Sequence, residues 1–224
     1  MLANELGRRG VSAALVDQKP STAFNPQANA TQARTMEHFR RLGISEEIRS
    51  LGLPIDFPTD VAYFTRYTHH ELARFRLPSA GQAIERVKHL SGSWSAAELP
   101  HRVSQKFVEQ VLRRHAEKLA GISINYGWRL VRFSENVHGV HALVERVADG
   151  ATKIIEASYL VGADGPRSTV RQALGIAYLG DQEIVRDFFG GRMHAIYLRA
   201  PDFYRIVPHP PAWMSVTFNR ERRA

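Results

Sequence analysis

Apolar residues recur along the chain with two different periods, and these periods predict helices and strands in alternation. Two leucines four residues apart predict a helix over 2–9, which Gly10 is suited to end. Residues 11–16 form a short, largely apolar strand that closes at Asp17. A helix, a glycine, an apolar strand and an acid in this order correspond to half of a βαβ unit.

The middle of the chain carries both patterns. Apolar residues at helical spacing predict helices over 31–42, 45–51 and 104–119, the last capped by its first residue, a serine. Alternating residues predict a β-hairpin over 60–77. The weakly patterned residues 78–100 are expected to be mostly loop.

Strand-like patterns dominate the second half. An Asp149-Gly150 pair is a strong hairpin signal, and the tail over 183–219 carries two or more β-like segments. The apolar end of one strand runs into Gly162 and then a short helix to about Leu174. The pattern predicts an α/β or α+β fold with inserted β-rich pieces. The expected strands are 122–126, 130–133, 140–147 and 154–161.

Composition and charge narrow the function classes. The net charge is +8, yet only 23% of residues are charged and no five like charges are consecutive. A solvated basic surface is the favoured interpretation, with an anionic ligand as the alternative. The absence of cysteine excludes disulfides, thiol catalysis and cysteine-based zinc sites. No signal peptide or membrane span is indicated, so we expect a cytoplasmic protein.

Two segments could bind a nucleotide. An acid at a strand end, such as Asp17, accepts hydrogen bonds from ribose hydroxyls in dinucleotide-binding units, but any βα unit can end a strand with a polar residue. The second segment follows the strand that ends at Val161. There Asp164 could accept from ligand hydroxyls, Gly165 permits close backbone approach, and Arg171 could reach a phosphate. A capped strand-to-helix turn explains this segment equally well.

Two further residues are weaker candidates when taken alone. Gln105 lies at the start of a predicted helix, where anions bind, but a simple capping turn is the favoured interpretation. Arg34 opens another helix and could clamp a phosphate, although exposed helical arginines are common. The ten histidines show no metal-ligand spacing, so no metal site is predicted. No aromatic-interleaved basic stripe of the kind that binds single-stranded nucleic acid is present.

Taken together, these segments resemble the aromatic-ring hydroxylases, the class A flavoprotein monooxygenases with the para-hydroxybenzoate hydroxylase fold. The most specific part of the resemblance is the run Tyr-Leu-Val-Gly-Ala-Asp-Gly-Pro-Arg-Ser-Thr-Val-Arg over 159–171. It looks like the family's Asp-Gly motif, which contacts FAD and serves NAD(P)H use. The resemblance covers essentially the whole chain in order.

The resemblance assigns roles to individual residues. It implies that Asp17 binds the adenosine ribose of FAD, that Arg34 lies on the flavin side, and that Gln105 contacts FAD. Leu130 matches a position with a backbone contact near the adenine. Asp164 and Gly165 would contact FAD through the Asp-Gly motif. No catalytic base is identified.

The resemblance also implies an organisation and an activity. An incomplete Rossmann-like FAD-binding sheet would accompany an inserted or appended, mostly antiparallel β domain for the substrate. With FAD as cofactor and NAD(P)H as co-substrate, the implied reaction hydroxylates a small aromatic, phenolic substrate with O₂. The expected oligomeric state stays open. The partial FAD-binding domain would comprise 1–57 and 101–180, and the partial substrate domain 58–100 and 181–224.

The sequence departs from the family in two places. It has no Gly-x-Gly-x-x-Gly loop and no second flavin motif, Gly-Asp followed by Ala-Ala-His. We therefore expect an internal fragment that by itself binds FAD weakly and has no activity. The alternatives are a non-enzymatic, truncated remnant and, more remotely, a basic module that binds nucleic acid.

Overall fold

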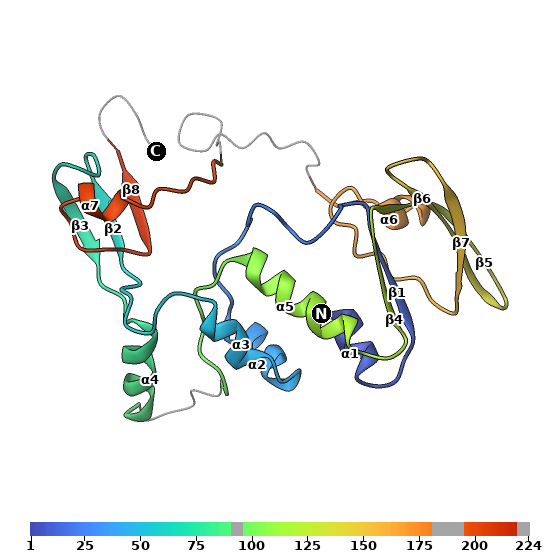
Figure 1. Cartoon of the computed structure of the whole chain (residues 1–224), viewed down its shortest axis with the longest axis horizontal. Coiled ribbons are helices and arrows are strands. Elements are labelled where there is room, and N and C mark those ends of the chain that lie inside the picture. Colours follow the sequence, from blue (N-terminus) through green and yellow to red (C-terminus); the bar gives the residue numbers. More distant parts are fainter. Residues whose placement is uncertain (91–95, 181–194, 219–224) are drawn as a thin grey trace. The chain divides into compact units, whose positions relative to one another are not determined.

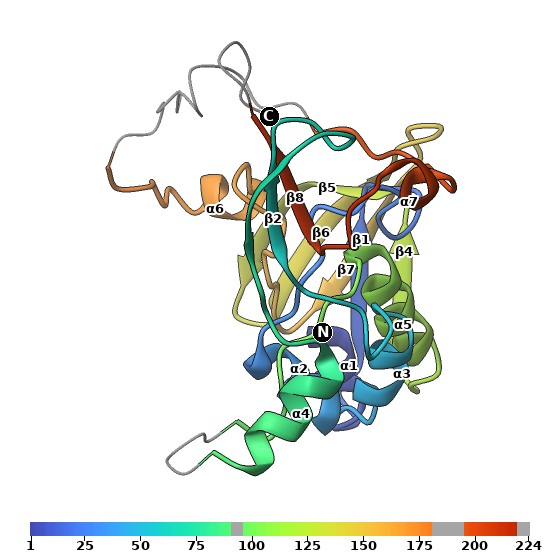
Figure 2. The ribbon, with the colours of Figure 1, turned by 90° about the vertical axis from the view of Figure 1, so that its left-hand side faces the viewer.

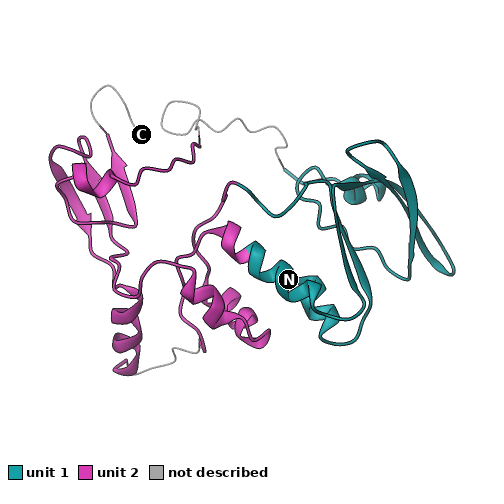
Figure 3. Ribbon diagram, in the orientation of Figure 1, with its two compact units in different colours: residues 1–24, 109–186 teal, residues 25–108, 187–224 magenta. Residues whose placement is uncertain are grey.

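The chain folds as two compact units, each discontinuous in sequence (Figure 3). The computed structural model describes residues 1–90, 96–180 and 195–218. Unit 1 comprises residues 1–24 and 109–186, and unit 2 comprises residues 25–108 and 187–224. These limits differ from those of the predicted FAD-binding and substrate domains. The predicted domains were defined by the ligand that each would bind, whereas the units are defined by compactness. Which residues bind FAD and which bind the substrate therefore stays a prediction.

A two-stranded parallel sheet starts unit 1. Helix α1 (Leu2–Gly7) leads through Gly10, at φ +73°, to strand β1 (Ala13–Asp17), as the pattern predicted. Strand β4 (Ile122–Tyr126) pairs with β1 in parallel, with Ala13 opposite Ile122 and Asp17 opposite Tyr126. Parallel pairing places the carboxyl ends of both strands at one edge of the sheet.

An antiparallel meander of three strands follows in unit 1, and the short helix α6 (Thr169–Ala173) comes after it (Figure 1). Its three strands are joined by short turns, and Gly150, at φ +74°, allows the predicted Asp-Gly turn. Val144, 1% exposed, and Ala142 of the central strand form its buried face. The strands are β5 (Trp128–Asn136), β6 (Gly139–Arg146) and β7 (Thr152–Ala157).

The strand predicted over 154–161 ends earlier than expected. Ala157 of β7 pairs with Val140, and the partner strand β6 begins at Gly139, so no neighbour in the meander remains for later residues. Tyr159 is 87% exposed. The prediction was wrong for 158–161, because an apolar run favours a strand only where a partner edge exists.

Besides the short α7 (Phe203–Ile206) in the tail, four of the described helices belong wholly or partly to unit 2. Met36, Phe39, Ile44 and Ile48 are at most 2% exposed and form the core around the first two of them. The helices are α2 (Ala33–Arg41), α3 (Ser45–Ser50), α4 (Ala80–Lys88) and α5 (Gln105–Glu117), the last of which crosses the unit boundary.

Two expectations about these helices were wrong. The segment 78–100 contains α4, whose start is fixed by a capping box between Ser79 and Gln82. None of its residues is buried, although Ala80, Ile84 and Val87 recur at helical spacing, so the sequence did carry a signal for this helix. Ser104 precedes α5 as predicted, but its buried hydroxyl makes no hydrogen bond, so the side chain does not cap the helix.

A three-stranded sheet completes unit 2 (Figures 1 and 2). The predicted hairpin is present as β2 (Val61–Phe64) and β3 (Glu71–Phe75). Strand β8 (Met214–Thr217) pairs with β2 in parallel, so only one of the two pairings is antiparallel. Together the two units confirm the α/β class.

The C-terminal tail contains a helix where only β-like segments were expected. A single helical turn, α7 (Phe203–Ile206), precedes β8. The first part of the predicted tail, residues 183–194, lies outside the described residues. Within the described part of the chain, no helix has the length and apolar character needed to cross a membrane.

Candidate functional site

Asp17 lies at the carboxyl edge of the β1–β4 sheet, where open α/β sheets bind ligands. Its Oδ1 accepts a hydrogen bond from the Lys19 N–H at 2.9 Å, which orients the carboxylate. A carboxylate has acceptor sites on both oxygens, so this contact leaves capacity for ligand hydroxyls. The position therefore suits the predicted ribose contact.

The surroundings of Asp17 are polar but not strongly cationic. Tyr126 stands opposite it, and burial raises the pKa of the Tyr126 phenol, although the nearby Arg113 guanidinium opposes that shift. Arg113 lies over the Tyr126 ring at 5.0 Å. Glu109 accepts a hydrogen bond from the Ala23 N–H at 2.7 Å, which ties the loop after β1 to α5. Neutral and acidic groups at this edge fit hydroxyls better than phosphates.

Asp164 has a structural role in addition to its predicted contact with a ligand. Its Oδ2 accepts hydrogen bonds from the N–H groups of Thr169 at 2.7 Å and Val170 at 3.4 Å, in the first turn of α6 (Thr169–Ala173). Desolvation opposes ionisation, but hydrogen bonds from Ser168 and these backbone groups lower the pKa of Asp164 overall. The carboxylate is thus ionised and held by α6.

The two glycines beside Asp164 have different roles. Gly165 has φ +81°, a conformation that favours glycine, and a Cβ there would meet nothing within 4 Å. A Cβ on Gly162 would lie 2.7 Å from Cβ of Val170. Gly162 thus allows the close approach of α6, whereas Gly165 supplies the turn.

Two other predicted contacts in unit 1 have local explanations. Arg171 donates to the Ile176 carbonyl at 2.6 Å and lies over the Tyr178 ring at 4.4 Å. Its guanidinium therefore contacts residues of its own segment. Leu130 lies in β5 opposite Val144, beside an irregularity in the pairing. No contact of Leu130 tests its predicted role.

In unit 2, two extended segments bring the regions of Arg34 and Gln105 together. Thr31 and His101 exchange backbone hydrogen bonds at 2.8 and 3.0 Å. The Gln105 N–H bonds the Ala28 carbonyl, and Gln105 Oε1 accepts from the Gln27 N–H at 3.1 Å. Arg34 and Gln105 therefore follow two paired segments, which the sequence could not reveal because they lie 71 positions apart.

Cationic side chains flank Gln105 and stack on aromatic rings of the tail. Arg102 lies 3.6 Å over the Trp213 ring, and Lys106 donates to the Tyr197 hydroxyl at 2.8 Å. Burial lowers the pKa of Arg102, which nevertheless stays charged at neutral pH. These contacts secure residues 197–213 to the start of α5.

An apolar surface that the sequence analysis did not identify is the open face of the β3–β2–β8 sheet. Paired residues share a face, and on this face every position is apolar or aromatic. Phe75 is 62% exposed, and Met214 and Phe218 are each 42% exposed. The two-residue spacing along the strands was the available signal. The face comprises Val61, Tyr63, Ala73, Phe75, Met214, Val216 and Phe218.

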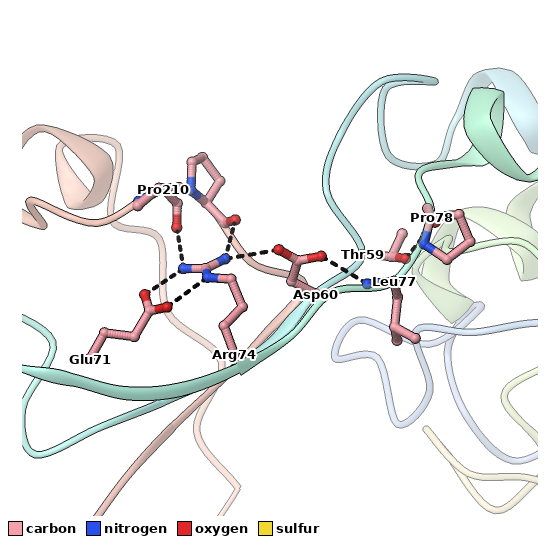
Figure 4. A network of polar contacts seen from close by, with 8 residues as sticks. Thr59, Asp60, Glu71, Arg74, Leu77, Pro78 and Pro210 are labelled. Atoms are coloured by element: carbon pink, nitrogen blue, oxygen red, sulfur yellow. Dashed lines mark hydrogen bonds and ion pairs between the residues drawn. The ribbon is translucent and has the colours of Figure 1, made fainter.

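The opposite face of that sheet is closed. Ala62, Phe64 and Ala212 form a small core, and the Phe64 ring lies 4.9 Å from that of His209. Arg74 on this face is fixed by Glu71, Asp60 and the Pro210 carbonyl (Figure 4). The sheet therefore has one rigid, supported face and one open, apolar face.

Each unit offers one type of group that FAD requires. Asp17 offers a hydroxyl acceptor in unit 1, and Arg34, whose side chain is 81% exposed, offers a cation in unit 2. An anionic dinucleotide needs both types of group. The donor set of the predicted residues is therefore compatible with FAD. Among the described residues no group of three metal-ligating side chains is present.

Comparisons with known proteins agree with this chemistry. A family profile described as "FAD binding domain" matches residues 1–224. Aklavinone 12-hydroxylase DnrF of Streptomyces peucetius subsp. caesius is 33% identical over 217 residues, covering 88% of this chain and 42% of that protein. The FAD-dependent monooxygenase opdD of Penicillium oxalicum is 33% identical, covering 67% of this chain and 29% of that protein.

Solved structures show the same likeness. A ternary complex of aklavinone-11 hydroxylase with FAD and aklavinone matches with a TM-score of 0.64 at 28% identity, over 77% of this chain and 32% of that one. The chain thus spans between 29% and 42% of the first curated relatives it matches. Because the family profile covers every residue, the chain belongs to the FAD binding domain family.

Proposed function

We propose that this protein acts in the FAD-dependent hydroxylation of an aromatic, polyketide-like substrate, with NAD(P)H as the reductant and O₂ as the oxygen source. The observation that carries the proposal is the match of the whole chain to the FAD binding domain family. Relatives named aklavinone 12-hydroxylase and polyketide hydroxylase support the substrate class.

Within this proposal, FAD supplies the redox and oxygen-transfer chemistry, and the protein binds and orients. Asp17 accepts hydrogen bonds from the ribose, and the Arg34 guanidinium neutralises phosphate charge. Gln105 offers an amide to the flavin side, and Leu130 a backbone group to the adenine side. Asp164 and Gly165 form a turn that approaches the cofactor, with the Asp164 carboxylate held by α6.

The open apolar face of the β3–β2–β8 sheet is the surface we assign to the substrate. Tyr63, Phe75 and Phe218 form edge-to-face ring pairs at 5.8 and 6.3 Å, which leave a rigid aromatic surface. Flat aromatic ligands bind such surfaces by dispersion and burial of apolar area. A supported sheet also excludes water from one side of the ligand.

FAD titration of the 224-residue chain, followed by flavin fluorescence, tests the cofactor assignment. We expect weak binding, because the sequence has no glycine-rich loop to donate backbone N–H groups to the pyrophosphate. Asp17→Asn should weaken it further, while the matched control Asp149→Asn, in a turn of unit 1, should not. Equal affinity for both variants would contradict the role of Asp17.

Titration with a soluble anthraquinone, followed by intrinsic fluorescence, tests the substrate surface independently of FAD. Phe75→Ala should lower the affinity several-fold, since it removes an exposed ring of the apolar face. Phe24→Ala removes a ring that is 88% exposed in unit 1 and serves as the control. A similar loss for both variants would indicate nonspecific adsorption and refute the assignment.

A further inference from the structure

Tyr63 occupies a central position on the open apolar face of the β3–β2–β8 sheet. It belongs to the middle strand β2 and lies opposite Ala73 of β3 and Val216 of β8. Directly paired residues point to the same face, so these three side chains form one row across the sheet. Tyr63 carries by far the largest side chain of its row, and a ligand that lies on this part of the face must contact it.

Two aromatic rings fix the orientation of the Tyr63 side chain. The Phe75 ring lies 5.8 Å from the Tyr63 ring at an interplanar angle of 80°, and the Phe218 ring lies 6.3 Å from it at 72°. Both are edge-to-face contacts, the geometry that aromatic pairs prefer. Phe75 belongs to β3 and Phe218 directly follows β8, so the tyrosine is held from both neighbouring strands. Its hydroxyl therefore has a defined position on the face.

Among the described residues of this face, Tyr63 alone carries a hydroxyl, and within the described part of the chain that hydroxyl has no hydrogen-bond partner. The neighbouring rings of Phe75 and Phe218 are exposed, so water solvates this part of the face. Tyr67 provides the contrast, because its hydroxyl donates to the Ser215 carbonyl at 3.2 Å. The Tyr67 hydroxyl thus serves the fold, whereas the Tyr63 hydroxyl is available to a ligand.

A flat ligand that covers the face removes water from the Tyr63 hydroxyl. A hydroxyl that loses water without gaining another partner costs free energy, whereas a hydrogen bond to the ligand compensates that loss. The face therefore disfavours a plain hydrocarbon and favours a ring system that places an oxygen beside the phenol. A phenol donates to a carbonyl oxygen and accepts from another hydroxyl, so both kinds of ring oxygen fit.

We propose that Tyr63 is a specificity-determining residue, which selects aromatic ligands bearing a ring carbonyl or hydroxyl over hydrocarbons of the same shape. The inference rests on the proposed function, because it takes the open apolar face as the substrate surface. Dispersion holds a flat ring to this face without fixing its direction, whereas a hydrogen bond to an immobile hydroxyl is directional. Tyr63 thus determines both which ligands bind and which edge of the ligand faces the phenol.

Calorimetric titration of the 224-residue chain with two probes of the same charge and nearly the same shape tests the inference. Anthraquinone-2-sulfonate carries ring carbonyls, and anthracene-2-sulfonate carries none. Tyr63→Phe should weaken binding of the quinone about fivefold, the effect of one ordinary hydrogen bond, and should leave the affinity for anthracene-2-sulfonate unchanged. Each probe is compared between variants, so the different hydration of the two probes cancels.

Two control variants complete the experiment. Tyr159→Phe removes an exposed hydroxyl of unit 1 and should change neither affinity, and Phe75→Ala should weaken both probes by a similar factor. Equal losses of both probes for Tyr63→Phe, or an unchanged affinity for the quinone, would overturn the inference while the substrate surface stands. If neither probe binds the wild-type chain, or if Phe75→Ala has no effect, the surface itself is refuted and the inference with it.

Discussion

Arg74 and Glu71 form a two-point ion pair, with Nε to Oε1 at 2.8 Å and Nη2 to Oε2 at 2.7 Å. The same guanidinium reaches Asp60 at 3.1 Å and the Pro210 and Pro211 carbonyls at 3.0 and 3.2 Å (Figure 4). Its hydrogen bond and charge lower the pKa of Glu71. One side chain thus joins β3, the residue before β2 and the segment before β8.

Removing that guanidinium should destabilise unit 2. The Arg74 side chain is only 11% exposed, so Arg74→Met leaves the Asp60 carboxylate with one fewer cation in a poorly solvated place. We expect a loss of about 3 kcal/mol in the free energy of unfolding. Denaturant titration followed by circular dichroism would measure it.

Two other variants make that measurement specific. Arg74→Lys keeps the charge but loses the planar fork, so it should lie between wild type and Arg74→Met. Arg129→Met breaks an ion pair whose arginine is 54% exposed and should cost less than about 1 kcal/mol. A loss for Arg74→Met no greater than that for Arg129→Met would show that the network adds little.

His101 should make unit 2 less stable in mild acid. Desolvation and the charge of Arg49 lower the pKa of the buried His101 ring, although a hydrogen bond with the Arg49 carbonyl opposes them. The unfolded chain then takes up the proton more readily than the folded one. Stability is therefore complete above the unfolded value of 6.5 and falls as the pH drops from there towards the folded pKa.

Thermal unfolding between about pH 5 and pH 8 checks this dependence. His101→Gln should flatten the curve relative to wild type, because it removes the group that must stay neutral. His138→Gln, on the exposed turn between β5 and β6, provides the control. If the wild-type and His101→Gln curves run parallel, the acid sensitivity comes from other groups.

Gly162→Ala should disturb the packing of α6. The new methyl group would meet Val170 at 2.7 Å, so either the helix or the segment around Gly162 must shift. Overpacking of this kind costs about 1–3 kcal/mol. Val170→Ala removes the obstructing atoms, so the double variant should recover part of the loss, which unfolding measurements on all three variants would show.

A second glycine tests whether the effect is steric. Gly81, in α4, would place its Cβ 3.4 Å from Ile55, an ordinary contact distance. Gly81→Ala should be neutral or stabilising by up to about 1 kcal/mol, because alanine favours helix. Equal destabilisation by both substitutions would argue against a specific clash at Gly162.

Local patterns predicted local structure well and long-range relations poorly. The hairpin over 60–77 and the Asp-Gly turn were predictable because two-residue alternation and turn residues act over a few positions. Helix α4 was missed although its apolar residues recur at helical spacing, because the glycine, serine and proline residues around it favour a loop. The strand expected to reach 161 ends where its partner strand begins, and the sequence does not state the register of that pairing.

In the candidate site, too, local features were predictable and long-range contacts were not. The place of Asp17 at the end of an apolar strand was predictable, while its contact with a ribose stays a prediction. The contact between Glu37 of α2 and Ala97 was not predictable, because the two residues lie some sixty positions apart. For the open aromatic face, alternation marks the residues of each strand, but no local pattern encodes the pairing of β2 with β8.

Asp164 offers a way to separate a structural role from cofactor binding. Asp164→Ala removes the acceptor for two N–H groups of α6, so it should lower stability by about 1 kcal/mol in the absence of FAD. Because the folded pKa is lowered, this contribution is present above the unfolded value of 3.8 and is lost as the pH falls through the folded pKa. The difference in stability between wild type and variant should therefore be full at about pH 7 and shrink progressively as the pH is lowered below 3.8. A variant as stable as wild type at pH 7 would mean that the carboxylate matters for ligand binding and not for α6.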